Sequence, residues 1–170
     1  MSSNHVGLPG LVDINPVEIV IPGQELIELI SSILTSGVVF RFRARGWSMT
    51  PFIRDGDVVT LAPLRGSLPG IGTIVAFVHP NSMNLVVHRV IARHDSQLLI
   101  QGDSAQHQSD GMISPDNLLG RVIEIERNGR KVWLGLGPER YLIALLSRSG
   151  LLVPVGSWLA SRLKQIARKP

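Results

Sequence analysis

A serine and a histidine in the middle of the chain have the chemistry needed for nucleophilic catalysis. Ser48 follows Gly46 at the end of a β-rich run, where the backbone can turn and expose the hydroxyl group. A serine hydroxyl is a weak nucleophile that needs a nearby base to take its proton. Histidine titrates near neutral pH and suits that task, and His88 lies in a later β-rich run. We therefore consider Ser48 a candidate nucleophile and His88 its candidate base.

Each of these residues also has an ordinary structural interpretation. A serine in a turn is usually a turn residue, and a histidine within a strand usually fills space in the core or at the surface. Aspartates beside glycine, such as Asp103 and Asp110, commonly form turns. The functional interpretation therefore depends on the order of these residues and on the motifs around them.

Five motifs follow one another through the middle of the chain. They are Gly-x-Ser-Met-x-Pro at 46–51, Asp-Gly-Asp-x-Val at 55–59, Gly-x-Ile-Val at 72–75, Val-His-Arg-Val at 87–90 and Gly-Asp at 102–103, with Asp110 beyond. Together they resemble the signal peptidase I superfamily over residues 40–126. More narrowly, they resemble the branch of the endoplasmic reticulum, archaea and some Gram-positive bacteria, in which histidine replaces the usual general-base lysine. The first motif is also similar to that of LexA-type self-cleaving peptidases, which share the fold but use lysine.

The resemblance implies a role for the matched residues. It implies a serine endopeptidase in which Ser48 attacks a peptide or protein substrate, forming an acyl-enzyme, and His88 acts as the base. It implies Asp103 or Asp110 as the third member of a triad, and we favour Asp103 narrowly because it stands in the stronger motif. It implies no cofactor.

The resemblance also implies how a substrate is held. The substrate pairs as an extended strand along a sheet edge, where main-chain hydrogen bonds hold it and side-chain pockets set preference. Gly46, Ser48 and Met49 are the residues expected against the substrate and its oxyanion. Gly46 stands where some members carry a hydroxyl that helps hold the oxyanion, so that donor is missing here. The alternative is therefore a non-catalytic peptide-binding or regulatory module on the same fold.

The hydrophobic pattern predicts a mainly β fold with helices at its two ends. Apolar residues recur at helical spacing over 24–36, and over 38–45 they alternate with arginines, which indicates a half-buried strand. Asn128-Gly129 predicts a hairpin turn. Further strands are expected at 57–62, 73–79, 84–93, 97–100, 121–127 and 131–134. The resemblance likewise implies the compact β fold of LexA and signal peptidase.

These elements divide the chain into three parts. Residues 1–23 contain prolines and little periodicity, so we expect an extended or flexible lead-in. Residues 24–137 form the expected peptidase domain, with its helix at 24–36 and its β core at 38–134. Residues 138–170 return to helical spacing with apolar and basic residues mixed. We expect this segment either to pack on the sheet or to make peripheral contact with a membrane.

Composition excludes several other functions. The chain has no cysteine, which excludes disulfides, thiolate zinc sites and a cysteine nucleophile. The formal charge of +4 comes from scattered basic residues without interleaved aromatic residues, so we expect no nucleic acid partner. The spacing of His79, His94 and His107 matches no metal-ligand pattern, and we expect no metal site.

The sequence shows no signal peptide and no membrane span. The first residues lack a basic stretch followed by an apolar one. The longest apolar stretch, residues 141–160, is interrupted by Arg148 and Pro154. We therefore expect a cytoplasmic or peripherally membrane-associated protein.

Overall fold

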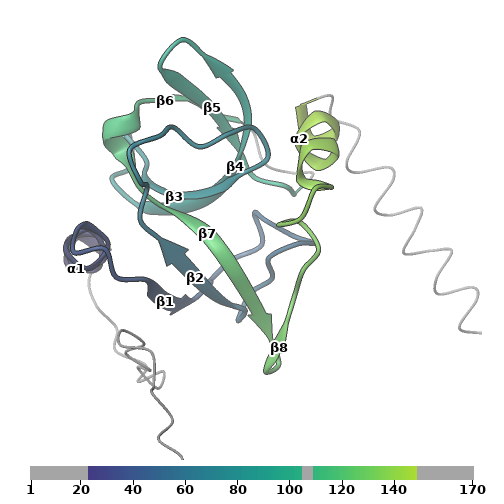
Figure 1. Cartoon of the computed structure of the whole chain (residues 1–170), viewed down its shortest axis with the longest axis horizontal. Helices are drawn as coiled ribbons and strands as arrows, with labels where there is room; N and C mark the ends of the chain where they lie inside the picture. The colour runs from purple at the N-terminus through teal and green to yellow at the C-terminus, as the bar shows by residue number, and fades with distance from the viewer. Residues whose placement is uncertain (1–22, 105–108, 149–170) are drawn as a thin grey trace, which may run out of the picture.

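The computed structural model describes residues 23–104 and 109–148, in which strands predominate and a helix stands at each end (Figure 1). The helices are α1 (Gly23–Thr35) and α2 (Arg140–Arg148). The strands are β1 (Phe40–Arg43), β2 (Val58–Ala62), β3 (Ile74–Val78), β4 (Leu85–His94), β5 (Gln97–Gln101), β6 (Ser109–Ile113), β7 (Leu118–Arg127) and β8 (Arg130–Lys131). The expected mainly β fold with terminal helices is confirmed.

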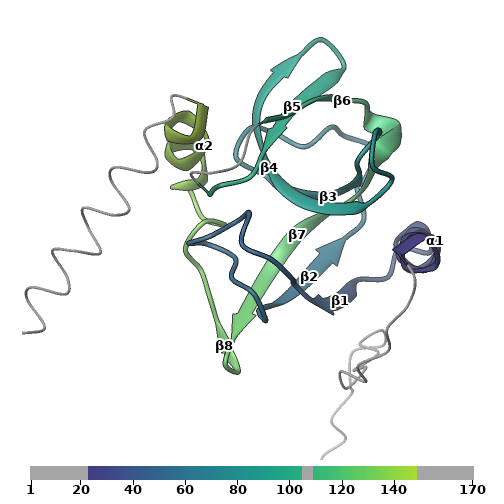
Figure 2. The same ribbon diagram turned by 180° about the vertical axis from the view of Figure 1, so that it is seen from behind.

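The strands of the described residues pair antiparallel in one curled sheet whose order does not follow the sequence. The order is β1, β2, β7, β3, β4, β5 and β6, and the short β8 pairs with β7. The register shifts within the β2–β7, β3–β7, β4–β5 and β5–β6 ladders, and such irregularities bend a sheet. Figure 1 and Figure 2 show the result: β3 to β6 curve around one part of the molecule, and β1, β2 and β7 form the other.

Two clusters of apolar side chains form the core, and β3 contributes to both. Ile74 and Ala76 belong to the cluster that Ile30 of α1 joins, whereas Val75 and Phe77 belong to the other. Successive side chains of a strand point to opposite faces, so this alternation means that β3 is buried on both sides. β4, which carries His88, pairs along one edge of β3, a strand whose first four residues are buried.

Two β segments differ from the expectations. No sequence signal predicts β6, because Asp110 and Gly111 within it are poor strand formers. Pairing with β5 nevertheless makes it a strand. The hairpin expected at Asn128-Gly129 is confirmed by the pairing of β7 with β8. Its second strand is shorter than the expected 131–134, since β8 ends at Lys131 and the side chains of Trp133 and Leu134 are 75% and 61% exposed.

Some expectations concern parts of the chain that the structure does not describe. The lead-in up to residue 22, residues 149–170 and His107 lie outside the described residues. The three-part division of the chain stays a prediction. Neither helix of the described residues is long and apolar enough to cross a bilayer.

Candidate active site

The turn that carries Ser48 follows β1 directly. Gly46 has a φ of +96°, a left-handed conformation that a residue without a Cβ atom adopts readily, and there the chain turns before Ser48. The Gly46 N–H donates to Asp55 Oδ1 at 2.8 Å. The Ala44 N–H donates to the Asp57 carbonyl at 2.7 Å, so the two ends of the loop are held together. The backbone around Ser48 is thus fixed before any substrate arrives.

Met49 holds the turn against the hydrophobic core. Its side chain is 4% exposed and packs in the core cluster beneath α1. Its carbonyl accepts hydrogen bonds from the N–H groups of Phe52 and Ile53, both at 3.0 Å. The expected position of Met49 against the substrate therefore does not describe its side chain, which serves the core. The half-buried Ser48 is held in place by this neighbour.

A buried ion pair fixes the far end of the same loop. Asp57 is 3% exposed and accepts hydrogen bonds from Arg127 Nε at 2.9 Å, Arg127 Nη2 at 2.7 Å and the Arg54 N–H at 2.8 Å. Burial acts to raise the pKa of Asp57, but these hydrogen bonds and the charge of Arg127 outweigh it and lower the pKa below 3.8. Arg127 Nη2 also donates to the Phe52 carbonyl at 3.0 Å, which ties the loop to β7.

His88 on β4 contacts Asp110 on β6. Its Nδ1 lies 2.6 Å from Asp110 Oδ2, and the two side chains are 3% and 10% exposed. The Phe77 ring packs beside the imidazole, with 6.4 Å between ring centroids and an interplanar angle of 58°. Because so little water reaches the pair, its hydrogen bond is stronger than it would be at the surface. This bond fixes the orientation of the His88 ring.

Asp103 has a different partner, the next residue on β4. Arg89 is fully buried and donates to Asp103 from Nε at 2.8 Å and from Nη2 at 2.7 Å. Its Nη1 donates to the carbonyls of Gly72 at 2.8 Å and Gly135 at 2.9 Å. Its guanidinium also lies 5.4 Å from the centroid of the Phe52 ring. Asp103 therefore neutralises a buried cation that joins three segments of the chain.

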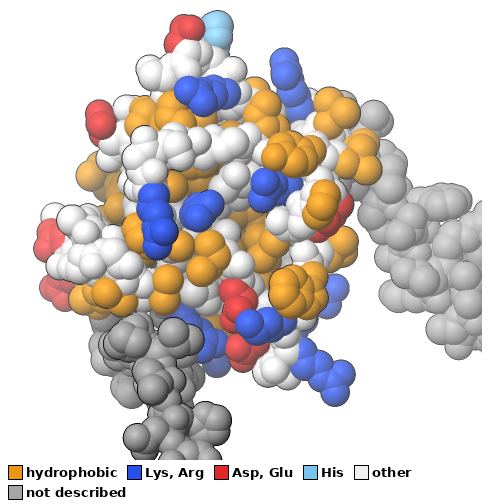
Figure 3. Space-filling view, viewed as in Figure 1, with side chains coloured by type: hydrophobic (Ala, Val, Ile, Leu, Met, Phe, Trp, Pro, Cys, Tyr) orange, Lys and Arg blue, Asp and Glu red, His pale blue; other side chains and the backbone are white. Residues whose placement is uncertain are grey.

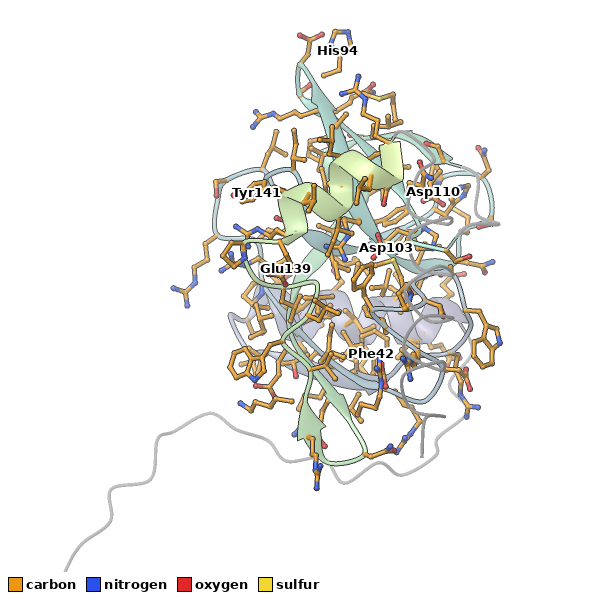
Figure 4. All side chains as sticks on the ribbon, turned by 90° about the vertical axis from the view of Figure 1, so that its right-hand side faces the viewer. Phe42, His94, Asp103, Asp110, Glu139 and Tyr141 are labelled. Atoms are coloured by element: carbon orange, nitrogen blue, oxygen red, sulfur yellow. The ribbon has the colours of Figure 1, made fainter. Side chains whose placement is uncertain are left out.

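The alternation of side chains along β4 explains this division. His88 and Arg89 are consecutive residues of one strand, so their side chains leave it on opposite faces. The sequence favoured Asp103 as the partner of His88, whereas the structure has Asp110 in contact with the imidazole. Figure 4 shows the two aspartates at separate places near α2. The carboxylate of Asp103 is committed to Arg89.

Ser48 reaches this region through its backbone. Its carbonyl accepts a hydrogen bond from the Ser104 N–H at 2.8 Å, and Ser104 follows Asp103 directly. Within the described residues the Ser48 hydroxyl makes no hydrogen bond to the His88 ring. Catalytic hydrogen bonds are often long without substrate and tighten when it binds, so this geometry is compatible with catalysis. The Ser48 N–H likewise has no hydrogen-bond partner in that part of the chain.

Residues 12–123 match the model of the Peptidase S24-like family. This chain belongs to that family. No curated protein matches it. Membership of the S24-like family confirms the superfamily that the motifs indicate. The matched range contains Ser48, His88, Asp103 and Asp110, and it ends within β7.

The other histidines of the S24-like chain have local roles where they are described. His79 Nδ1 accepts hydrogen bonds from the N–H groups of Asn81 and Ser82, both at 3.3 Å, and so shapes the turn before β4. His94 ends β4 in an exposed position. No group of three or more His, Cys, Asp or Glu side chains in residues 23–104 and 109–148 is arranged to hold a metal ion.

Sequence reasoning did not single out the residues that support the site. Arg89 is part of the Val-His-Arg-Val motif, and a charged residue in the middle of an apolar strand was the available signal. Asp57 belongs to the Asp-Gly-Asp motif. Its partner Arg127 lies 70 residues further on, and only the fold brings the two together.

Proposed function

We propose that this S24-like chain is a serine endopeptidase in which Ser48 is the nucleophile, His88 the general base and Asp110 the acid that orients His88. The observation that carries the proposal is the buried hydrogen bond of 2.6 Å between His88 Nδ1 and Asp110 Oδ2. A carboxylate in this position selects the tautomer of the imidazole and stabilises its protonated form.

The proposed reaction has two halves. With Nδ1 bound to Asp110, Nε2 of His88 takes the proton from Ser48 Oγ, and Oγ attacks the scissile carbonyl. The tetrahedral intermediate collapses when Nε2 gives the proton to the leaving amine, which leaves an ester on Ser48. Water then gives a proton to Nε2 and attacks the ester, and the acid product leaves as the proton returns to Ser48.

One backbone N–H group near Ser48 is able to donate a hydrogen bond to the oxyanion of this reaction. The Ser48 N–H is available to it, whereas the Gly46 N–H is used by Asp55 Oδ1. Gly46 also has no hydroxyl to offer. Removal of one oxyanion-hole donor typically costs roughly 10²–10³ in rate, so we expect a slow peptidase.

The proposed substrate is an extended peptide. β1 is an edge strand of the sheet in the described residues, and it leads directly to the turn that carries Ser48. A peptide that pairs with the free edge of β1 would bring its backbone to the nucleophile. Because the proposed base is histidine rather than lysine, we place the chain nearest to the serine–histidine branch of the signal peptidases.

The test combines a cleavage assay with an active-site label. The full chain is incubated with extended peptides and export precursors, and separately with a fluorophosphonate that acylates activated serines. We expect labelling at Ser48, and a loss of cleavage of at least about 10³-fold in Ser48→Ala and His88→Ala. The exposed Ser96→Ala serves as the control and should be labelled and active like the parent chain.

Two outcomes would overturn the proposal. Cleavage that survives both substitutions would remove Ser48 and His88 from the mechanism. Peptide binding without any labelling or cleavage would instead support the alternative, a non-catalytic peptide-binding module. The missing hydroxyl at Gly46 and the engaged Gly46 N–H are the observations that favour this alternative.

A further inference from the structure

A hollow of about 410 Å³ lies between the β2–β3 connection, β7 and the segment that leads into α2. Its walls are formed by residues 64–74 in part, by Arg121 to Ile123 of β7, and by Gly135, Leu136 and Arg140. Figure 3 shows the face on which β7 lies in front, and there Lys and Arg side chains stand among hydrophobic ones. None of Ser48, His88 and Asp110 lines the hollow, so it is separate from the proposed active site.

The hollow is lined by cations without an anionic partner in the part of the chain that the structure describes. Arg65, Arg121 and Arg140 line it, and no described aspartate or glutamate does. None of these arginines forms an ion pair within the described residues, whereas Arg89 and Arg127 each have a carboxylate partner. Charges of one sign around a concave surface focus the field and raise the local concentration of counter-ions. The hollow is therefore a strongly favourable place for an anion.

Glu139, beside Arg140, does not neutralise the hollow. Its Oε1 accepts hydrogen bonds from the N–H groups of Gly135 at 2.7 Å and Gly137 at 3.0 Å. The pKa of Glu139 is lowered most by a hydrogen bond from its own N–H and further by those from Gly135 and Gly137. Its charge thus serves the backbone that leads into α2.

Arg140 has an unused donor that is shielded from water. Among residues 23–104 and 109–148 its Nε has no hydrogen-bond partner, although its Nη2 donates to the Tyr141 hydroxyl at 3.2 Å. A Cβ atom at Gly72 would lie 2.8 Å from Arg140 Cγ, so the absence of a side chain at Gly72 lets Arg140 lie against that loop. A buried N–H without an acceptor costs free energy, and an oxygen of a bound anion would supply the acceptor once the Arg140 side chain turned into the hollow.

Part of the remaining wall is apolar, beside the hydroxyl groups of Ser67 and Thr73. Leu68, Ile74 and Leu136 line the hollow, and Ile71 and Ile123 are exposed at or near it. A simple ion would leave the exposed Ile71 and Ile123 in contact with water. A ligand with both an anionic group and a carbon skeleton would cover them.

We infer that this hollow binds a phosphate monoester, with Arg65, Arg121 and Arg140 holding the phosphate and the apolar walls holding its carbon skeleton. A phosphate monoester carries close to two negative charges and three acceptor oxygens. It can therefore bind several arginines at once, whereas a carboxylate has one charge and two oxygens. Arginine is the side chain whose planar fork matches phosphate oxygens. The inference is independent of the proposed peptidase activity, because the two sites share no residue.

The phosphate has two possible sources, a free phosphate compound or the headgroup of a lipid, and one experiment distinguishes them. Binding of the full chain is measured by calorimetry with inorganic phosphate, and by flotation with vesicles of phosphatidic acid or of phosphatidylcholine. Ionic strength is matched with chloride. Arg121→Glu is compared with Arg93→Glu, an exposed arginine at the end of β4 that changes the charge equally. Arg65→Glu, in an exposed loop, is the second variant if Arg121→Glu fails to fold.

Three results are possible, and each decides the inference. If inorganic phosphate binds and Arg121→Glu weakens it by about tenfold or more while Arg93→Glu does not, the hollow takes a free phosphate compound. If only phosphatidic acid vesicles bind, with the same dependence on Arg121, it takes a lipid headgroup. If neither binds, or if Arg121→Glu weakens binding no more than Arg93→Glu does, the hollow is not a phosphate site and the inference is overturned.

Discussion

His88 and Arg89 are neighbours on β4, and each holds an aspartate, Asp110 on one face of the strand and Asp103 on the other. The two pairs look alike in sequence and differ in chemistry. The guanidinium of Arg89 is wholly buried and stays charged, so it fixes structure and exchanges no proton. An imidazole, unlike a guanidinium, is able to serve as a base near neutral pH, and Asp110 holds the ring of His88 in place. An acid beside a base is therefore not sufficient to indicate catalysis; the nature of the base decides.

The largest expected effect is a loss of catalytic activity when Asp110 is replaced, which distinguishes its role from that of Asp103. Asp110→Asn should lower kcat by roughly 10⁴, because an amide no longer selects the tautomer of His88 or stabilises its protonated form. Folding should be nearly unchanged, since the amide has a similar shape. The measurement is peptide cleavage under saturating substrate, with far-UV circular dichroism as the check on folding. Asp95→Asn, at an exposed hairpin position, is the matched control. A variant that keeps a tenth of the parent activity would contradict the role given to Asp110.

The second expected effect concerns stability. Asp103→Asn leaves the Arg89 cation buried without its carboxylate, and breaking a buried pair in this way costs about 3–5 kcal/mol. We expect the midpoint of urea unfolding to fall accordingly. The folded fraction should still react with the fluorophosphonate at Ser48. If Asp103→Asn instead keeps its stability and loses its labelling, the two aspartates have been assigned to the wrong partners.

A double substitution sharpens the same comparison. Arg89→Met combined with Asp103→Leu removes both charges, so the electrostatic part of the loss should be recovered. The carbonyls of Gly72 and Gly135 would still lose their donor. We therefore expect the double variant to lie between Asp103→Asn and the parent chain in its free energy of unfolding. Equal stability of the double and single variants would mean that the buried charge is not the cause.

The sequence predicts the architecture better than it predicts the partners within the site. Apolar periodicity locates α1 and most strands because burial itself produces that pattern. It does not reveal β6, whose polar residues form a strand only because β5 offers them hydrogen bonds. Asp110 lies on β6, so the pairing of His88 with Asp110 could not be read from spacing. The motif containing Asp103 was the stronger one, but motif strength indicates only that a residue matters. In the structure Asp103 neutralises Arg89.

The smallest expected effect concerns the loop behind Ser48 and depends on pH. Because the folded-state pKa of Asp57 is lowered below 3.8, its ionised form favours folding. That contribution is fully present above the unfolded-state pKa and is lost as the pH falls through the folded-state pKa. Asp57→Asn should therefore cost about 1–3 kcal/mol at neutral pH, and the difference from the parent chain should shrink below about pH 4.

Urea unfolding of both chains at neutral pH and at about pH 3 measures this difference, with the exposed Asp116→Asn as the control. Arg127 does not complicate the result, since the hydrogen bonds that it donates to Asp57 raise the pKa of Arg127 and the guanidinium stays charged throughout. A stability difference that is the same at both pH values would mean that Asp57 acts by its shape and not by its charge. The ion pair would then not be what holds the loop behind Ser48 to β7.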